Sequence, residues 1–288
     1  MLKMLRAELW KALHNTYFYL ALGIGVVIIA MNAVQNASVV QELTERTISG
    51  LMKGYSSGDA GGFSLFNHAL VYHGVNFSSA LFKTVWPVLA AIPFAWSYSE
   101  DRRGGMYNQL VIRGNIGQYA LAKYAAAFVS GGLTVMFIVL TDLLVTALIC
   151  PYYVFDGMDA LSFIGNKSFL SELFYTVPWI HALIWCVVTF FLGGAVAGLT
   201  FLAGARLKLR VLVILVPYAI LSVWNVVYYS VLKEYFGEYL PSLELSPLEL
   251  IIVSSAKNPE WLVFITIGLL TSVGVGAAFW QVKRHELV

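Results

Sequence analysis

Residues 99–123 read SEDRRGGMYNQLVIRGNIGQYALAK, a polar and basic stretch that lies between two of the most apolar runs of the chain. Hydrophobic residues make up 59% of the 288 positions and charged residues 12%, about half of the roughly 25% charged content of soluble domains. The many Trp, Tyr and Phe residues suit aromatic belts at two membrane interfaces. We therefore predict an integral membrane protein in which residues 99–123 connect two membrane spans.

Six apolar runs are long enough to cross a hydrocarbon core about 30 Å thick, which takes about 20 helical residues. No pattern favours strands, because a membrane barrel would need short alternating segments. The sequence therefore predicts an all-α protein that forms a single transmembrane domain over residues 1–288. The six spans are expected near 16–35, 80–98, 119–150, 178–204, 210–232 and 260–281.

Lys and Arg residues are sorted between the two sides of this arrangement. Of the 18 in the chain, about two thirds fall in the termini and in the segments on the same side, which include residues 99–123. Cytoplasmic segments carry the excess of Lys and Arg in membrane proteins. Both termini are therefore predicted to be cytoplasmic.

The first fifteen residues, MLKMLRAELWKALHN, have the pattern of an amphipathic helix. At 100° per residue, four leucines fall within about 80° of one another: Leu2, Leu5, Leu9 and Leu13. Such a helix is expected to lie in the inner headgroup layer and to lead into the first span. A simple extension of the first span is the alternative.

The two longest outer segments are expected to hold more than linkers. The first, at about 36–79, is rich in aromatic residues. The last, at about 233–259, contains the apolar run 245–253, which is too short to span. A short re-entrant or interfacial helix before the sixth span fits this run, provided that protein or water satisfies its backbone.

The sequence contains no motif of an enzyme. H-E-x-x-H, G-x-S-x-G and the P-loop are all missing, so neither a catalytic residue nor a nucleotide site is expected on this chain. Cys150 and Cys186 have no spacing that suggests a metal site or a disulfide framework. We expect no metal and no nucleic-acid partner.

Three polar residues in or near the spans are candidates for a substrate path: Asp142, His181 and Asn225. Asp142 is the one acid predicted within a span, where an unpaired carboxylate costs at least ~2.5 kcal/mol. It could serve a substrate path or proton relay, or it could be a protonated or hydrogen-bonded structural group. For His181 the alternative is an ordinary interfacial histidine.

Close helix packing is predicted in the fourth span. Gly194 and Gly198 form a G-x-x-x-G pair, and such small residues let two helix backbones approach. We expect this face to pack on another helix. Whether that helix belongs to the same chain is left open by the sequence.

Within residues 99–123 the sequence predicts a short, bounded cytoplasmic helix. Two i, i+4 pairs give it an apolar ridge: Met106 with Leu110, and Tyr107 with Val111. Gly114 stands where a helix commonly ends, and Asn115 can cap the next helix. The alternative is a loop that serves membrane topology alone.

In this segment the sequence resembles the ABC-2 type permease family, the membrane subunits of one class of bacterial ABC exporters. The local match consists of SYSEDRRG at 97–104, NQL at 108–110, Arg113 and LAKY at 121–124. It is similar to that family's order of an acidic residue, a glycine, a short helix, an arginine and a lysine that opens span three. The amphipathic N-terminal helix, the six spans and the element before span six extend the resemblance over most of the chain.

The resemblance implies an exporter subunit in a bacterial plasma membrane that moves an amphipathic peptide, antibiotic or lipid-like substrate outward. ATP and Mg²⁺ would bind to a separate ATPase subunit, and a second copy or paralogue of the permease would complete the path within the lipid membrane. The helix between spans two and three would be the coupling helix that docks on the ATPase. The coupling residues would be Glu100, Asp101, Arg102, Arg103, Met106, Tyr107, Leu110, Val111 and Arg113.

Two other classes of function compete with this interpretation. A gradient-driven secondary transporter would use Asp142 as its ion-coupling residue, although the chain shows no internal repeat of the kind common in such transporters. A membrane receptor or immunity protein would bind a peptide through the aromatic outer segments without transport.

Overall fold

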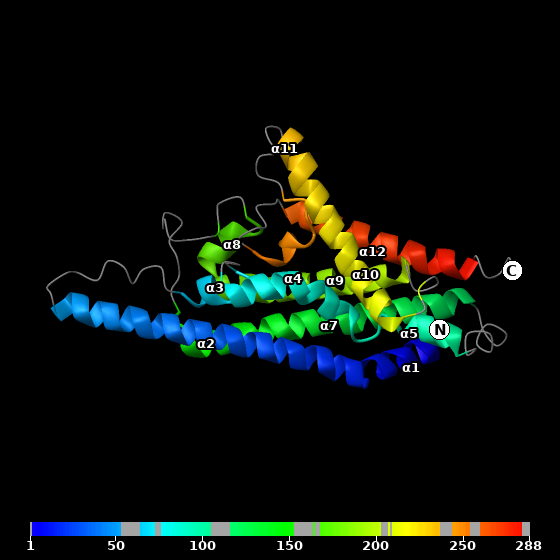
Figure 1. Cartoon of the computed structure of the whole chain (residues 1–288), viewed down its shortest axis with the longest axis horizontal. Helices are drawn as coiled ribbons and strands as arrows, with labels where there is room; N and C mark the ends of the chain where they lie inside the picture. Colours follow the sequence, from blue (N-terminus) through cyan, green and yellow to red (C-terminus); the bar gives the residue numbers. More distant parts are fainter. Residues whose placement is uncertain are drawn as a thin grey trace.

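The computed structural model describes residues 2–52, 64–72, 76–104, 116–152, 164, 168–202, 207, 209–236, 244–253 and 260–283. Within these ranges all regular secondary structure is helical. Figure 1 shows an elongated bundle in which α1 (Leu2–Leu13) and the last turns of α12 (Glu260–Lys283) lie at the same end. We call this the terminal end of the bundle and the opposite one the distal end.

Five long helical segments are apolar enough to cross a membrane among the residues described. They are Thr16–Arg46 in α2 (Thr16–Met52), Gly117–Ile149 in α7 (Ile116–Ile149), Pro178–Leu202 in α9 (Pro178–Gly198) with η2 (Leu199–Leu202), Arg210–Tyr235, which starts with α10 (Arg210–Val227), and Glu260–Trp280 in α12. Each overlaps one of the predicted spans. The chain is therefore an all-helical protein with the features of a multi-pass membrane protein.

The second predicted span, at 80–98, has a different form. The structure has a 15-residue helix, α4 (Phe77–Ala91), then a turn at 92–96 and the short helix α5 (Ser97–Arg103). Pro93 explains the break, because proline lacks the N–H that a helix needs and its ring crowds the preceding turn. Six full-length spans are therefore not confirmed, since α4 is a shorter apolar helix.

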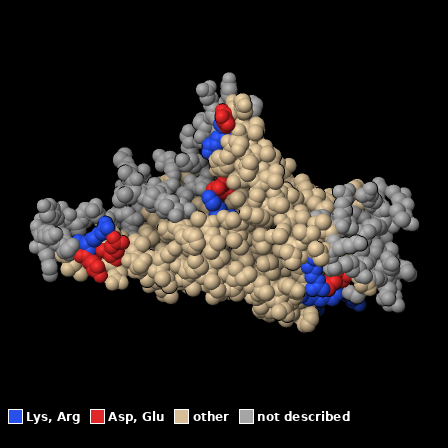
Figure 2. All heavy atoms as spheres, in the orientation of Figure 1, with Lys and Arg blue, Asp and Glu red and all other residues tan. Residues whose placement is uncertain are grey.

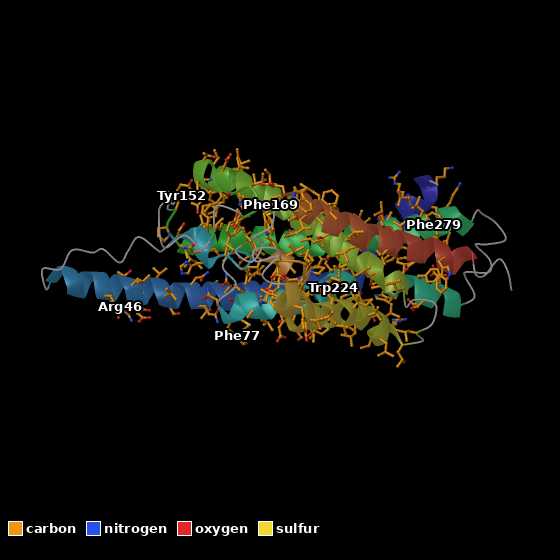
Figure 3. All side chains as sticks on the ribbon, turned by 90° about the horizontal axis from the view of Figure 1, so that it is seen from above. Arg46, Phe77, Tyr152, Phe169, Trp224 and Phe279 are labelled. Carbon is orange, nitrogen blue, oxygen red and sulfur yellow. The ribbon has the colours of Figure 1, made fainter. Side chains whose placement is uncertain are left out.

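The first outer segment also differs from the prediction, because α2 continues to Met52 instead of ending near residue 35. Residues 36–49 contain neither glycine nor proline, and polar side chains pair along the helix. Gln41 donates a hydrogen bond to Glu45 (3.1 Å), and Arg46 forms an ion pair with Glu42 (2.5 Å). Such i, i+4 pairs stabilise an exposed helix. Figure 3 shows Arg46 far out along this extension.

Helix α7 is the centre of the bundle and contacts α1, α2, α4, α9 and α12. Its closest neighbour is α9, and glycines line the contact. A Cβ atom on Gly131 would lie 2.5 Å from Ala197 Cβ and 2.5 Å from the Ala90 carbonyl oxygen, and one on Gly194 would lie 2.8 Å from the Phe128 carbonyl oxygen. Because no side chain fits there, the two backbones meet directly.

The outer faces of the long helices carry large apolar side chains. Trp224 on α10, Phe264 and Leu269 on α12 and Val27 on α2 are all exposed. Soluble proteins rarely expose apolar surface on this scale, whereas lipid covers it without cost. In Figure 2 the charged side chains gather near the two ends, at the tip by α11 (Lys233–Phe236) and in one small central pair.

Short elements fill the distal half of the bundle. They are α3 (Leu65–His68), α8 (Ser171–Thr176), the π-helical turn η3 (Tyr228–Leu232) and η4 (Glu249–Ile251). The predicted short element at 245–253 contains η4, and its residues 250–253 are almost completely buried. Indole N–H groups of Trp86 and Trp185 donate to the carbonyl oxygens of Leu248 (3.4 Å) and Ile251 (3.3 Å). Irregular backbone is stable inside a membrane protein when other parts of the protein satisfy it in this way.

Candidate functional site: a buried ionic junction beside residues 105–115

A buried lysine joins three helices at the terminal end. Lys123 is in the second turn of α7 and is only 2% exposed. Its ammonium lies 2.7 Å from Glu8 Oε2 on α1 and 2.7 Å from Asp101 Oδ2 on α5, and it donates a hydrogen bond to Ser97 Oγ (2.5 Å). We call Glu8, Ser97, Asp101 and Lys123 the ionic junction.

The surroundings of the ionic junction balance its charge. Lys11 forms an ion pair with the other carboxylate oxygen of Glu8 (3.0 Å), so that two cations meet two anions. The Tyr119 hydroxyl donates a hydrogen bond to Asp101 (2.7 Å), and the Phe94 ring centroid lies 5.0 Å from the Lys123 ammonium. An aromatic face at this distance attracts a cation. The arrangement is complete enough to hold a charged side chain inside the protein.

A second, more exposed link starts from the same short helix. Glu100 on α5 forms an ion pair with Arg210 at the start of α10, and both side chains are 40% exposed. The guanidinium carbon of Arg210 lies 4.9 Å from the Trp96 ring centroid, and Arg210 also donates to the hydroxyl of Tyr17 on α2 (3.2 Å). Helix α5 is thereby tied to α1, α2, α7 and α10.

The ionic junction lies next to the predicted coupling segment in the chain. Helix α5 ends at Arg103 and α7 begins at Ile116, so the two helices that flank residues 105–115 are held together by Asp101 and Lys123. A displacement of residues 105–115 would act on both helices and, through Glu8, on α1.

The predicted coupling residues are only partly placed by the structure. Met106, Tyr107, Leu110, Val111 and Arg113 lie outside the described residues. The structure describes the backbone of Arg102 and Arg103 as part of α5 but does not describe their side chains.

Of the two acids of this set, Asp101 points into the protein toward Lys123, whereas Glu100 is 40% exposed and pairs with Arg210. The sequence resemblance implied that both acids couple the chain to an ATPase. It did not anticipate the pairing of Lys123 with Glu8. The only signal was that both residues fall in segments predicted to lie on the same side of the membrane.

The candidates for a substrate path lie toward the distal end, and each is held by hydrogen bonds. Asp142 on α7 is 1% exposed and accepts hydrogen bonds from Asn32 Nδ2 (2.8 Å) and from the backbone N–H of Leu70 (2.8 Å). Asn32 in turn accepts a hydrogen bond from Ser78 Oγ (2.8 Å). Asp142 therefore fastens residues 64–72 and α2 to α7.

His181 and Asn225 have similar local partners. The Tyr72 hydroxyl lies 2.9 Å from His181 Nδ1, and the Phe169 carbonyl oxygen lies 3.1 Å from its Nε2. Asn225 on α10 accepts a hydrogen bond from Ser246 Oγ (2.7 Å). Residues 64–72 contact both Asp142 and His181, whereas Asn225 contacts the separate segment 244–253. The three residues do not form one polar set.

The predicted glycine pair lies at the contact between α7 and α9. Gly194 meets Phe128 and Gly198 meets Tyr124, both on α7 of the same chain. Among the residues that the structure describes, no group of three or more His, Cys, Asp or Glu side chains is close enough to hold a metal ion.

Comparisons with known proteins place the chain in no group. No protein-family model matches it, and no curated protein matches it.

Proposed function

We propose that the chain is the membrane-spanning permease subunit of an ATP-driven ABC exporter, and that residues 99–123 receive the movement of a separate ATPase subunit. The observation that carries the proposal is the ionic junction. It binds α5 and α7, which flank residues 105–115, to each other and to α1 through one buried lysine.

The proposed movement follows from the packing. A push on residues 105–115 reaches α5 and the first turns of α7, and the paired charges resist sliding because separating them would leave buried ions without partners. Helix α7 contacts α1, α2, α3, α4, α9 and α12, and the glycine contact fixes α9 to it. The pair α7 and α9 would therefore move as a unit and carry the movement across the membrane.

The remaining parts of the proposal come from the resemblance stated above. ATP and Mg²⁺ bind to the partner ATPase, a second permease copy completes the path, and the substrate is an amphipathic molecule moved outward across a bacterial plasma membrane. Both termini are cytoplasmic in this arrangement, which agrees with the position of α1 and α12 at one end of the bundle (Figure 1).

The test is co-purification with an ATPase that carries a Walker motif. We expect that Leu110→Asp, which puts a charge in the proposed docking ridge, lowers the amount of ATPase recovered and the hydrolysis that substrate stimulates. The double variant Arg102→Glu/Arg103→Glu should do the same. Arg46→Glu, which changes a charge on the distal extension of α2, is the matched control.

Unchanged recovery and unchanged coupling in both test variants would contradict the proposal. Transport that survives ATP depletion but collapses with the proton or sodium gradient would favour the secondary transporter. In that case Asp142, which meets only neutral donors among the described residues, would be the first residue to substitute.

A further inference from the structure

Helix α1 has an inner face and an outer face, and the structure sorts their charges. Glu8 is the only acid of α1. It points inward, is 4% exposed and is held by Lys123 and Lys11. Met4 and Leu9 pack against the core cluster around Tyr119. The leucine-rich side of α1, expected from the sequence to face the membrane, is thus partly covered by protein.

The outer face of α1 is basic and aromatic. Lys3, Arg6, Trp10 and His14 are exposed, and at 100° per residue these positions fall within about 80° of one another. Trp10 is 62% exposed and stacks on the His14 ring with centroids 4.6 Å apart. No acid lies on this face, because the ionic junction holds Glu8 on the other side.

The outer face of α1 adjoins surface that lipid covers. Helix α2 begins at Thr16, two residues after His14, and its first turns expose Tyr19 and Leu20 on the way into the apolar segment Thr16–Arg46. A Trp beside Lys and Arg at such a position is typical of residues at the level of lipid headgroups, where the apolar ring and the charged groups both find partners.

We propose that the outer face of α1, formed by Lys3, Arg6, Trp10 and His14, binds the anionic headgroups of phospholipids in the leaflet at the terminal end. The positive charge of this face, on which α1 carries no acid, selects anionic over zwitterionic headgroups, and Trp10 sits between the headgroups and the acyl chains. This inference does not depend on the proposed exporter function, because it rests on the exposed side chains of α1 and of the adjoining start of α2.

The experiment uses the full chain in a neutral detergent with an environment-sensitive fluorophore on Ala7→Cys. Ala7 is exposed beside the outer face of α1, and the native Cys150 and Cys186 are buried. Short-chain phosphatidylglycerol is titrated into the labelled protein, and short-chain phosphatidylcholine is titrated in parallel. We expect a saturable blue shift with phosphatidylglycerol alone, which weakens as salt is added.

The variant Lys3→Gln/Arg6→Gln identifies the binding face. Each basic residue near an anionic surface contributes about fivefold, so the double variant should raise the apparent Kd on the order of 25-fold. Arg46→Gln/Lys233→Gln removes two exposed basic charges elsewhere and should leave the Kd unchanged.

Thermal unfolding in phosphatidylcholine checks that both double variants remain folded. Equal responses to the two lipids, or a Kd that Lys3→Gln/Arg6→Gln changes less than twofold, would overturn the proposal.

Discussion

Substitution of Lys123 by methionine tests the ionic junction, because methionine has a similar length and no charge. The substitution leaves the buried carboxylates of Glu8 and Asp101 without the ammonium that lies 2.7 Å from each. Among the described residues, Lys11 would remain as the cation paired with Glu8. Removing one partner from a buried ion pair costs about 3–5 kcal/mol, so the free energy of unfolding should fall by about that amount.

The assay is reversible unfolding of the full chain in mixed micelles of a mild detergent and SDS, followed by circular dichroism. The matched control is Arg46→Met, which breaks the pair with Glu42 at the far end of α2. Those two side chains are 73% and 61% exposed. An exposed pair contributes about 0–1 kcal/mol, so this control should unfold almost like the unmodified protein.

A third variant separates charge from packing. Glu8→Gln/Asp101→Asn/Lys123→Met removes every charge of the ionic junction, and replacing a whole buried set costs less than orphaning part of it. This triple variant should be more stable than Lys123→Met alone. The reasoning fails if Lys123→Met loses no more than Arg46→Met, or if the triple variant is the least stable of the three.

Three further predictions use the same unfolding assay. Gly131→Val should cost at least about 1–3 kcal/mol because its side chain has no room, whereas Gly23→Val, with no atom within 4 Å of an added Cβ, should have little effect; equal losses would contradict the close contact. Trp185→Phe removes an indole N–H that donates to a buried carbonyl group and should cost about 1–3 kcal/mol, while the exposed Trp261→Phe should be nearly neutral. Burial raises the pKa of the Glu244 carboxyl, although the hydrogen bonds that it accepts lower it. Its contribution to the free energy of unfolding is therefore fully present below the pKa of the unfolded state and is lost as the pH rises through the pKa of the folded state. Glu244→Gln should remove this part of the pH dependence of the free energy of unfolding.

Hydropathy predicted the long helices because their apolar length is a local property of the sequence. Five of the six expected runs coincide with helices of spanning length. The run at 80–98 contains Pro87 and Pro93, and the structure keeps Pro87 inside α4 but ends the helix before Pro93. The sequence shows both prolines as helix breakers, and only the surrounding packing decides which one ends the helix.

Two other features of the structure could not be predicted from the sequence, for different physical reasons. Residues 41–46 in the extension of α2 are mostly polar and exposed, and hydropathy does not separate such a helix from a loop. The partners of Lys123 come from Glu8 and Asp101, which are far apart in sequence and meet only in the folded bundle. A single sequence gives the side of the membrane on which such charges lie but not which of them pair.

The pairing of Glu8 with Lys123 has a consequence for synthesis of the protein. Glu8 leaves the ribosome 115 residues before its partner (123 − 8), a delay of about 6–23 s at roughly 5–20 residues per second. During that interval Lys11, which lies on the same helix and pairs with Glu8 in the folded protein, is already present. Helix α1 can therefore form its contact with Lys123 only after the start of α7 has been synthesised. Nascent chains that end before residue 123 should leave α1 accessible to protease.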